Sequence, residues 1–136
     1  MGKLNLEIIT PEKVTVSEEV ESVVAPGSLG EFGVLEGHVP FLTGILPGEV
    51  HYSSGGALTH LAVTTGFVEI SNDKVSILVD AAEKVQDIDA ERARKAMERA
   101  TARLSKDGGS EDIDFLRAEA ALKRAIARVK VVEKMT

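Results

Sequence analysis

Hydrophobic and polar residues alternate with a period of two along the first part of the chain. Leu4, Leu6 and Ile8 are separated by polar residues, and the alternation stops at Thr10-Pro11. A period of two places the apolar side chains on one face of a strand. Similar short runs, mostly separated by Gly, Pro, Asn, Asp or Ser, lie at 13–17, 20–25, 32–35, 41–46, 48–52, 58–64, 66–70 and 74–79. Many short strands joined by turns predict an antiparallel β-sandwich or barrel.

The pattern changes near residue 88 from strand-like alternation to helical spacing. The hexapeptide Ile88-Asp89-Ala90-Glu91-Arg92-Ala93 returns in similar form as Ile113-Asp114-Phe115-Leu116-Arg117-Ala118. In each copy an aspartate precedes helix-forming residues, so its carboxylate can accept a hydrogen bond from the first helical turn. We therefore expect two helices, over about 90–104 and 115–133.

Each expected helix has one apolar stripe, and the connection between the two is short. The stripes consist of Ala93, Met97, Ala100 and Leu104, and of Phe115, Ala118, Leu122, Ile126 and Val129. Glycines at 108 and 109 suit a helix end and a reversal, which predicts an antiparallel hairpin. The expected fold is α+β and mainly β, with a sandwich or barrel over residues 1–86 and a helical hairpin over 87–136.

The alanine-rich stripes predict helices that are stable as helices but dock weakly. Each missing methylene removes roughly 0.8 kcal/mol of burial. Such a hairpin could fold back or swing out if a partner supplies a few kcal/mol. On the sequence alone, however, a plain helical hairpin that never moves is the favoured interpretation.

Composition restricts the chemistry that the chain can perform. Cysteine is absent, which excludes disulfides, thiolate catalysis and cysteine-based metal sites. Residues 1–87 hold four basic and thirteen acidic side chains, whereas residues 88–136 hold twelve and nine. The last helix would therefore be attracted to an acidic surface. Few aromatic residues and an acidic first part argue against nucleic acid, and the sequence predicts neither export nor membrane insertion.

No catalytic or metal site is expected from the motifs. The glycine-rich stretch 26–33 precedes a strand, whereas phosphate-binding loops precede a helix, so tight turns explain it better. A loop gripped by a partner through Leu29 and Phe32 is the alternative. His38, His51 and His60 show no carboxylate or cysteine at metal-ligand spacing.

Arginines recur at helical spacing on both expected helices. They are Arg92, Arg99 and Arg103 on the first, and Arg124 and Arg128 on the second. Solvated faces or pairs within one helix are the ordinary explanation. If the hairpin closes, however, guanidinium groups from both helices could bind phosphate oxygens, while Glu83 and Asp89 accept hydrogen bonds from a base or ribose.

The pattern G-E-x-G-x-x-x-G-H-x-P-x-L-T over residues 30–43, with Pro47-Gly48, closely resembles the ε subunit of bacterial F-type ATP synthases. The resemblance runs over essentially the whole chain. It implies a non-catalytic rotor subunit whose sandwich binds the γ stalk and the c-subunit ring. It also implies a movable hairpin that extends toward the α and β subunits and inhibits ATP hydrolysis. The expected location is the cytoplasmic face of the bacterial inner membrane, as a peripheral protein.

The resemblance also implies roles for individual residues. Residues expected to contact an acidic segment of β are Arg117, Lys123, Arg124, Arg128 and Lys130, and those expected to contact the c ring are Glu31, Phe32 and His38. Some family members bind ATP in the folded hairpin through I/L-D-x-x-R-A. The matching residues here are Glu83, Ile88, Asp89, Arg92, Ala93, Arg99, Arg124 and Arg128. No cofactor is required, and ATP would be a regulatory ligand.

Two other functions remain open on the sequence. One is a freestanding nucleotide-sensing module that uses the arginine cluster without a stalk partner. The other is a β-sandwich interaction domain with an inert hairpin.

Overall fold

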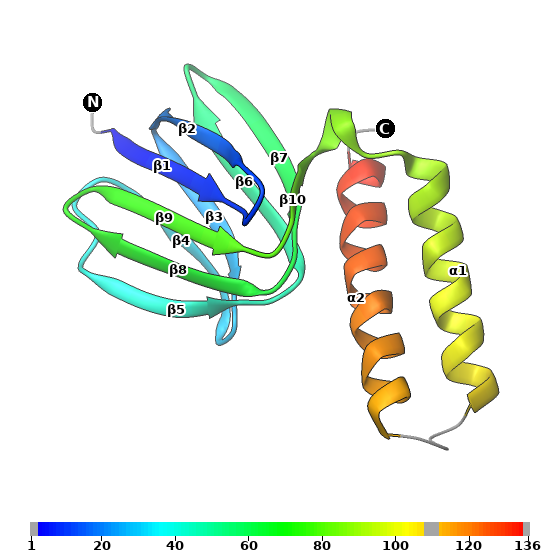
Figure 1. Ribbon diagram of the computed structural model, residues 1–136. Helices are drawn as coiled ribbons and strands as arrows, with labels where there is room; N and C mark the ends of the chain where they lie inside the picture. Colours follow the sequence, from blue (N-terminus) through cyan, green and yellow to red (C-terminus); the bar gives the residue numbers. More distant parts are fainter. Residues whose placement is uncertain (1–2, 108–111, 135–136) are drawn as a thin grey trace.

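The computed structural model describes residues 3–107 and 112–134, and the side chains of residues 3–104 and 116–133 within them. In this part of the chain ten strands precede two helices (Figure 1). The strands are β1 (Leu4–Ile9), β2 (Val14–Val20), β3 (Ser22–Gly27), β4 (Gly30–Val34), β5 (Phe41–Ile45), β6 (Gly48–Ser54), β7 (Ala57–Val63), β8 (Gly66–Ser71), β9 (Lys74–Val79) and β10 (Ala82–Lys84). A 3₁₀ turn, Val85–Asp87, leads to α1 (Ala90–Asp107) and α2 (Asp112–Lys134). The predicted fold, mainly β with two C-terminal helices, is confirmed.

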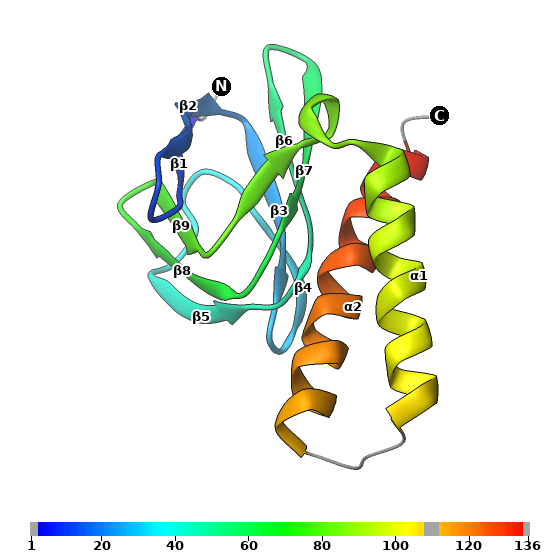
Figure 2. The ribbon, with the colours of Figure 1, turned by 45° about the vertical axis from the view of Figure 1, so that its right-hand side comes forward.

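The strands form one continuous sheet that curls into a sandwich. Its strand order is β10-β7-β6-β3-β5-β8-β9-β1-β2, with β4 paired to β3. Neighbours in this order are antiparallel except β1 and β9, which are parallel. The expectation of purely antiparallel pairing was therefore wrong at this pair. The helices lie beside the β6–β7 side of the sandwich, as Figures 1 and 2 show.

Alternating side chains of the strands meet in the core. Leu4, Leu6 and Ile8 are fully buried, as their spacing predicts, and Val75 and Ile77 of the neighbouring β9 are buried with them. Burying a Leu, Ile or Val side chain stabilises the fold by roughly 1.5–3 kcal/mol. The core therefore lies entirely within the strand region, and the helices are added outside it.

Several strand boundaries differ from the sequence prediction by up to three residues, and one strand was not predicted. β2 continues to Val20, because an edge strand tolerates the exposed Glu18 and Glu19. β10 was not predicted at all. Three residues are too few to show a period, and the strand exists because its backbone pairs with β7, Ala82 opposite Val63.

Of the two predicted helix starts, one is confirmed and the other is wrong. Asp89 caps α1 as predicted, since its Oδ1 accepts a hydrogen bond of 3.1 Å from the backbone N–H of Arg92. Asp114 was expected in the same role for α2. Instead α2 begins at Asp112, so Asp114 lies in its first turn rather than in front of it. The predicted glycine reversal at 108–109 and the side chain of Phe115 lie outside the described residues.

The helices run antiparallel, and α2 lies between α1 and the sandwich (Figures 1 and 2). The predicted stripes face inward: Ala93, Ala100 and Ala118 are buried. α2 buries more than its predicted stripe, because it packs on α1 and also on β6 and β7. Ala125, Ala127 and Val131 are accordingly buried as well.

Tyr52 is the only tyrosine of a chain without tryptophan, and it is 2% exposed in the core. Burial, followed by a hydrogen bond with Glu18, raises the pKa of Tyr52 from its ordinary value of 10.0 to about 12. Ultraviolet titration should therefore find tyrosinate forming near pH 12 in the folded chain and near pH 10 in denaturant. Because the folded pKa is the higher one, this stabilisation is complete below pH 10 and is lost as the pH rises toward 12. A folded-state midpoint near 10, or unchanged alkaline stability in Tyr52→Phe, would contradict this burial.

Candidate functional site

A polar pocket of about 320 Å³ lies where the end of the sandwich meets both helices. We call it the junction pocket. Its lining residues are Glu83, Asp87, Ile88, Asp89, Arg92, Ala93, Ala96, Arg99 and Arg128. They come from β10, the 3₁₀ turn and its following residues, α1 and α2. The pocket therefore exists only while the hairpin is folded against the sandwich.

Local sequence positions the α1 side of this pocket. The Asp89 cap marks where α1 begins, and the buried Ala93 and Ala100 show which face of α1 is turned toward the rest of the molecule. Arg92, Ala96 and Arg99 then follow at steps of four and three, which places them on one helical face. Small alanines between the arginines leave room for a ligand.

Glu83 and Arg128 join the sandwich to α2. The Arg128 guanidinium Nε–H donates to Glu83 Oε1 over 2.6 Å, and each side chain is about one third exposed, at 33% and 35%. A charge-assisted hydrogen bond of this length is stronger than a bond between neutral groups. This ion pair connects β10 to α2 at the wall of the junction pocket.

A second hollow of about 220 Å³ continues between the helices. We call it the interhelical groove. It is lined by Arg99, Arg103, Arg124 and Arg128 and by the alanines 96, 100, 118, 121 and 125. Among the described residues that line it, none is acidic. Arg99 and Arg128 belong to both hollows, so the groove extends the junction pocket.

The two hollows differ in charge, because the junction pocket combines three carboxylates with Arg92, Arg99 and Arg128, whereas the described residues that line the groove are all arginines and alanines. Glu83, Asp87 and Asp89 provide hydrogen-bond acceptors in the junction pocket, where the hydroxyl or amino groups of a base or ribose could donate. The arginines of the groove provide planar donors to which phosphate oxygens could bind. A junction pocket of 320 Å³ falls within the usual range for small-molecule sites.

Seven of the eight residues expected to bind ATP line the junction pocket, and the eighth, Arg124, lines the adjoining groove. The structure thus brings the whole expected set together. The sequence interpretation missed Asp87 and Ala96. The helical phase could have found Ala96, because it lies four residues after Arg92, and Asp87 directly precedes the motif.

The residues expected to contact the c ring occupy β4 and the loop after it. Phe32 and His38 both lie against Phe41, with ring centroids 5.5 and 5.9 Å from it. Glu31 is exposed and precedes Phe32 on the same strand, so the two side chains point to opposite faces. The structure therefore groups Phe32 with His38 and leaves Glu31 on the other face of β4.

The residues expected to contact an acidic segment lie along α2. Arg117, Lys123, Arg124 and Lys130 are exposed in the folded hairpin, whereas Arg128 is half-buried by its bond to Glu83. Lys123 lies 3.4 Å from Glu119, one helical turn before it. Arg124 and Arg128 thus belong to both expected sites.

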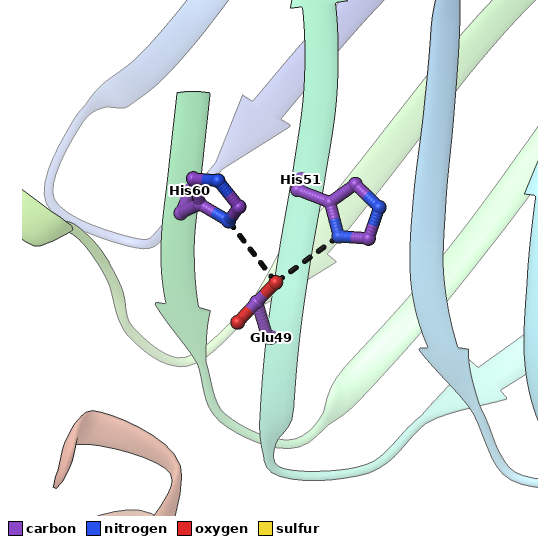
Figure 3. A group of neighbouring side chains, drawn as sticks. All are labelled: Glu49, His51 and His60. Carbon is purple, nitrogen blue, oxygen red and sulfur yellow. Dashed lines mark hydrogen bonds and ion pairs between the residues drawn. The ribbon is translucent and has the colours of Figure 1, made fainter. Parts of the chain in front are cut away.

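His51 and His60 have a carboxylate partner that the sequence interpretation did not find. Glu49 Oε1 lies 3.1 Å from the Nδ1 atom of each ring (Figure 3). The statement that these histidines lack carboxylate partners was therefore wrong. Glu49 and His51 share one face of β6, and His60 lies directly opposite His51 on β7.

The architecture defined by these observations is a β-sandwich module with a docked helical hairpin and a polar site at their junction. A sequence model described as the β-sandwich domain of ATP synthase delta/epsilon chains matches residues 3–85. A second, the long α-helix domain of the same chains, matches residues 86–133. The chain belongs to the ATP synthase delta/epsilon chain family.

Among curated relatives, the similarity is to epsilon chains. The ATP synthase epsilon chain of Geotalea daltonii is 50% identical over 104 residues, which cover 76% of this chain and 75% of that protein. That of Desulfosudis oleivorans is 51% identical over 102 residues, covering 74% and 77%. The resemblance to ε subunits, which are non-catalytic subunits of the ATP synthase, is confirmed.

Solved structures share the fold at low sequence identity. A chain of the Euglena gracilis mitochondrial ATP synthase OSCP/F1/c-ring structure has a TM-score of 0.82 and 23% identity, with 93% of this chain and 79% of that chain covered. A chain of the Tetrahymena thermophila central stalk/c-ring structure has a TM-score of 0.58 and 18% identity, with 98% and 96% covered. None of the helices in residues 3–107 and 112–134 is long and apolar enough to cross a membrane.

We expect Glu83→Gln to loosen the docked hairpin. The change leaves Arg128 without its charged partner, which should cost about 1–2 kcal/mol of docking free energy at this partial exposure. Amide hydrogen exchange in α2 should become about tenfold faster, while exchange in β1 and β9 stays unchanged. Glu119→Gln is the matched control, because it removes an exposed pair within α2. Equal α2 exchange in the wild type and Glu83→Gln would show that the pair does not hold the hairpin.

Proposed function

We propose that the chain is a rotor subunit of the central stalk of an F-type ATP synthase. In this role it couples rotation of the c ring to ATP synthesis and inhibits ATP hydrolysis when α1 and α2 extend into the catalytic head. Membership of the delta/epsilon family supports the assignment to the complex. Two observations support a hairpin that can leave the sandwich. One is that a partly exposed ion pair, Glu83–Arg128, joins β10 to α2. The other is that most buried side chains of the two helices are alanines.

ATP is the proposed regulatory ligand of the folded hairpin. The observation that carries this proposal is the assembly of one polar site from β10, α1 and α2 together. A ligand that touches all three elements binds the folded hairpin better than the extended one. It therefore shifts the population toward the folded state by mass action.

Arg124 and Arg128 take part in both the folded and the proposed extended state of the hairpin, so the two states compete for these side chains. In the folded state Arg128 bonds to Glu83, and Arg124 lines the interhelical groove. In the proposed extended state the same side chains, with Arg117, Lys123 and Lys130, face acidic residues of the β subunit. A phosphate group bound in the groove would oppose that exchange, so plentiful ATP would relieve the inhibition.

The sandwich provides the proposed contacts with the other rotor subunits, and these contacts stay in place when the hairpin moves. Glu31, Phe32 and His38 are assigned to the c ring. An apolar strip on the outer face of β5, β8 and β9 suits the γ subunit, because Leu42, Phe67 and Leu78 are 66%, 46% and 36% exposed there. Exposed apolar residues gathered on one face are typical of protein interfaces. The chain would then lie at the cytoplasmic face of the bacterial inner membrane as a peripheral subunit.

Isothermal titration should detect ATP binding to the full chain, and Arg92→Ala and Arg99→Ala should each weaken it about tenfold or more, because each removes a charge-assisted donor. Arg94→Ala is the matched control. It removes an equal charge from the same helix, and Arg94 is exposed and not among the residues that line either hollow. Absence of heat at millimolar ATP, or equal affinity in Arg92→Ala and Arg94→Ala, would refute the ATP site without touching the stalk assignment.

The inhibitory role is tested by adding chains back to an ε-free catalytic head and measuring its ATPase rate. The full chain should lower the rate, whereas a chain ended after Asp87 should bind without lowering it. A full chain that binds without inhibiting would make the hairpin inert and leave only the coupling role. If neither chain binds, the assignment to the central stalk fails.

A further inference from the structure

Glu49, His51 and His60 form a compact group of metal-ligating side chains outside the junction pocket (Figure 3). One carboxylate oxygen and two imidazole nitrogens lie within 4.8 Å of one another. The three side chains are partly buried, with exposed fractions of 13% for Glu49, 27% for His51 and 16% for His60. An ion could therefore reach the group from solvent and still be held away from bulk water.

The backbone holds these three positions in a defined relation. β6 and β7 are joined by Gly55-Gly56, whose φ angles of +59° and +82° suit the two-residue hairpin turns that match strand twist. That turn sets the register in which His51 faces His60. Glu49 follows two residues from His51 on the same strand, so all three side chains leave the same face.

The hydrogen bonds already direct the Nδ1 atoms of both rings toward Glu49 Oε1. An ionised carboxylate can only accept, so each ring that contacts Glu49 Oε1 donates through Nδ1–H. The two distances are 3.1 Å. In a tetrahedral site with zinc–nitrogen and zinc–oxygen bonds of about 2.0–2.2 Å, ligand atoms lie about 3.3 Å apart. The two nitrogen–oxygen distances are thus close to the required spacing before any ion binds.

We propose that Glu49, His51 and His60 bind a divalent late transition metal ion, with zinc as the best-suited ion. Two imidazoles and one carboxylate are a ligand set that zinc uses, with water in the fourth position. Magnesium and calcium prefer all-oxygen sites and are not expected to compete. The ion would replace the two N–H···O bonds and tie β6 to β7.

Binding through Nδ1 requires a change of tautomer. Each neutral ring gives up its Nδ1 proton to solvent and takes one at Nε2, so no net proton is released. The lone pair on Nδ1 then binds the metal ion. Nuclear magnetic resonance of the rings distinguishes the two tautomers. If the three residues formed only a structural hydrogen-bond cluster, adding zinc would not change the tautomer of either ring.

The test is titration of the full chain with zinc chloride, followed by calorimetry and by nuclear magnetic resonance of the histidine rings. We expect one ion per chain and conversion of His51 and His60 to the Nε2–H tautomer. His60→Gln and Glu49→Gln should each weaken binding about tenfold or more. His38→Gln is the matched control, because His38 is the third histidine of the chain and lies in the loop after β4.

Two results would overturn the proposal. The first is zinc affinity in His60→Gln equal to that in the wild type. The second is a set of wild-type ring spectra that do not change at saturating zinc, and this measurement needs no variant to fold. Magnesium chloride at the same concentration should leave the ring spectra unchanged, and an equal response to magnesium would contradict a nitrogen-ligated site.

Discussion

The hydrogen-bonded ion pair between Glu83 and Arg128 connects the two parts of this molecule. Glu83 belongs to a three-residue strand at the edge of the sheet, and Arg128 belongs to the helix that packs on β6 and β7. With the pair formed, arginines of both helices face one polar site. Without the pair, that site would lose part of its wall, so docking of the hairpin and the ligand binding proposed for the site would depend on the same contact.

Most of the other buried side chains of the hairpin are small. Alanines make up most of them, and each removes little apolar area from water; Val129 and Val131 are the larger buried side chains of α2. The sandwich core, by contrast, contains many fully buried Leu, Ile and Val side chains. The free energy that holds the hairpin is therefore small compared with that of the sandwich. A rigid body with a weakly docked arm suits a rotor subunit, because the arm can change state while the body stays bound.

Much of this architecture follows from residue spacing. The alternation at Leu4, Leu6 and Ile8 and the spacing of Ala93 and Ala100 predict buried faces correctly. β10 escapes prediction because only its pairing with β7 makes it a strand. The packing of α2 on the sandwich depends on contacts between residues that are far apart in the sequence. The spacing of apolar residues within one element cannot predict such contacts. The Glu49 cluster could have been predicted, because a two-residue turn at Gly55-Gly56 already sets its register.

In the proposed regulation, ATP keeps the hairpin on the sandwich. Since the chain has no cysteine, two can be introduced for spin labels, at the exposed Leu58 of β7 and the exposed Lys123 of α2. Distances between the labels should be measured in the assembled synthase with and without ATP. We predict one short, narrow distribution with ATP and an added long component without it. Identical distributions in both conditions would contradict the proposed regulation.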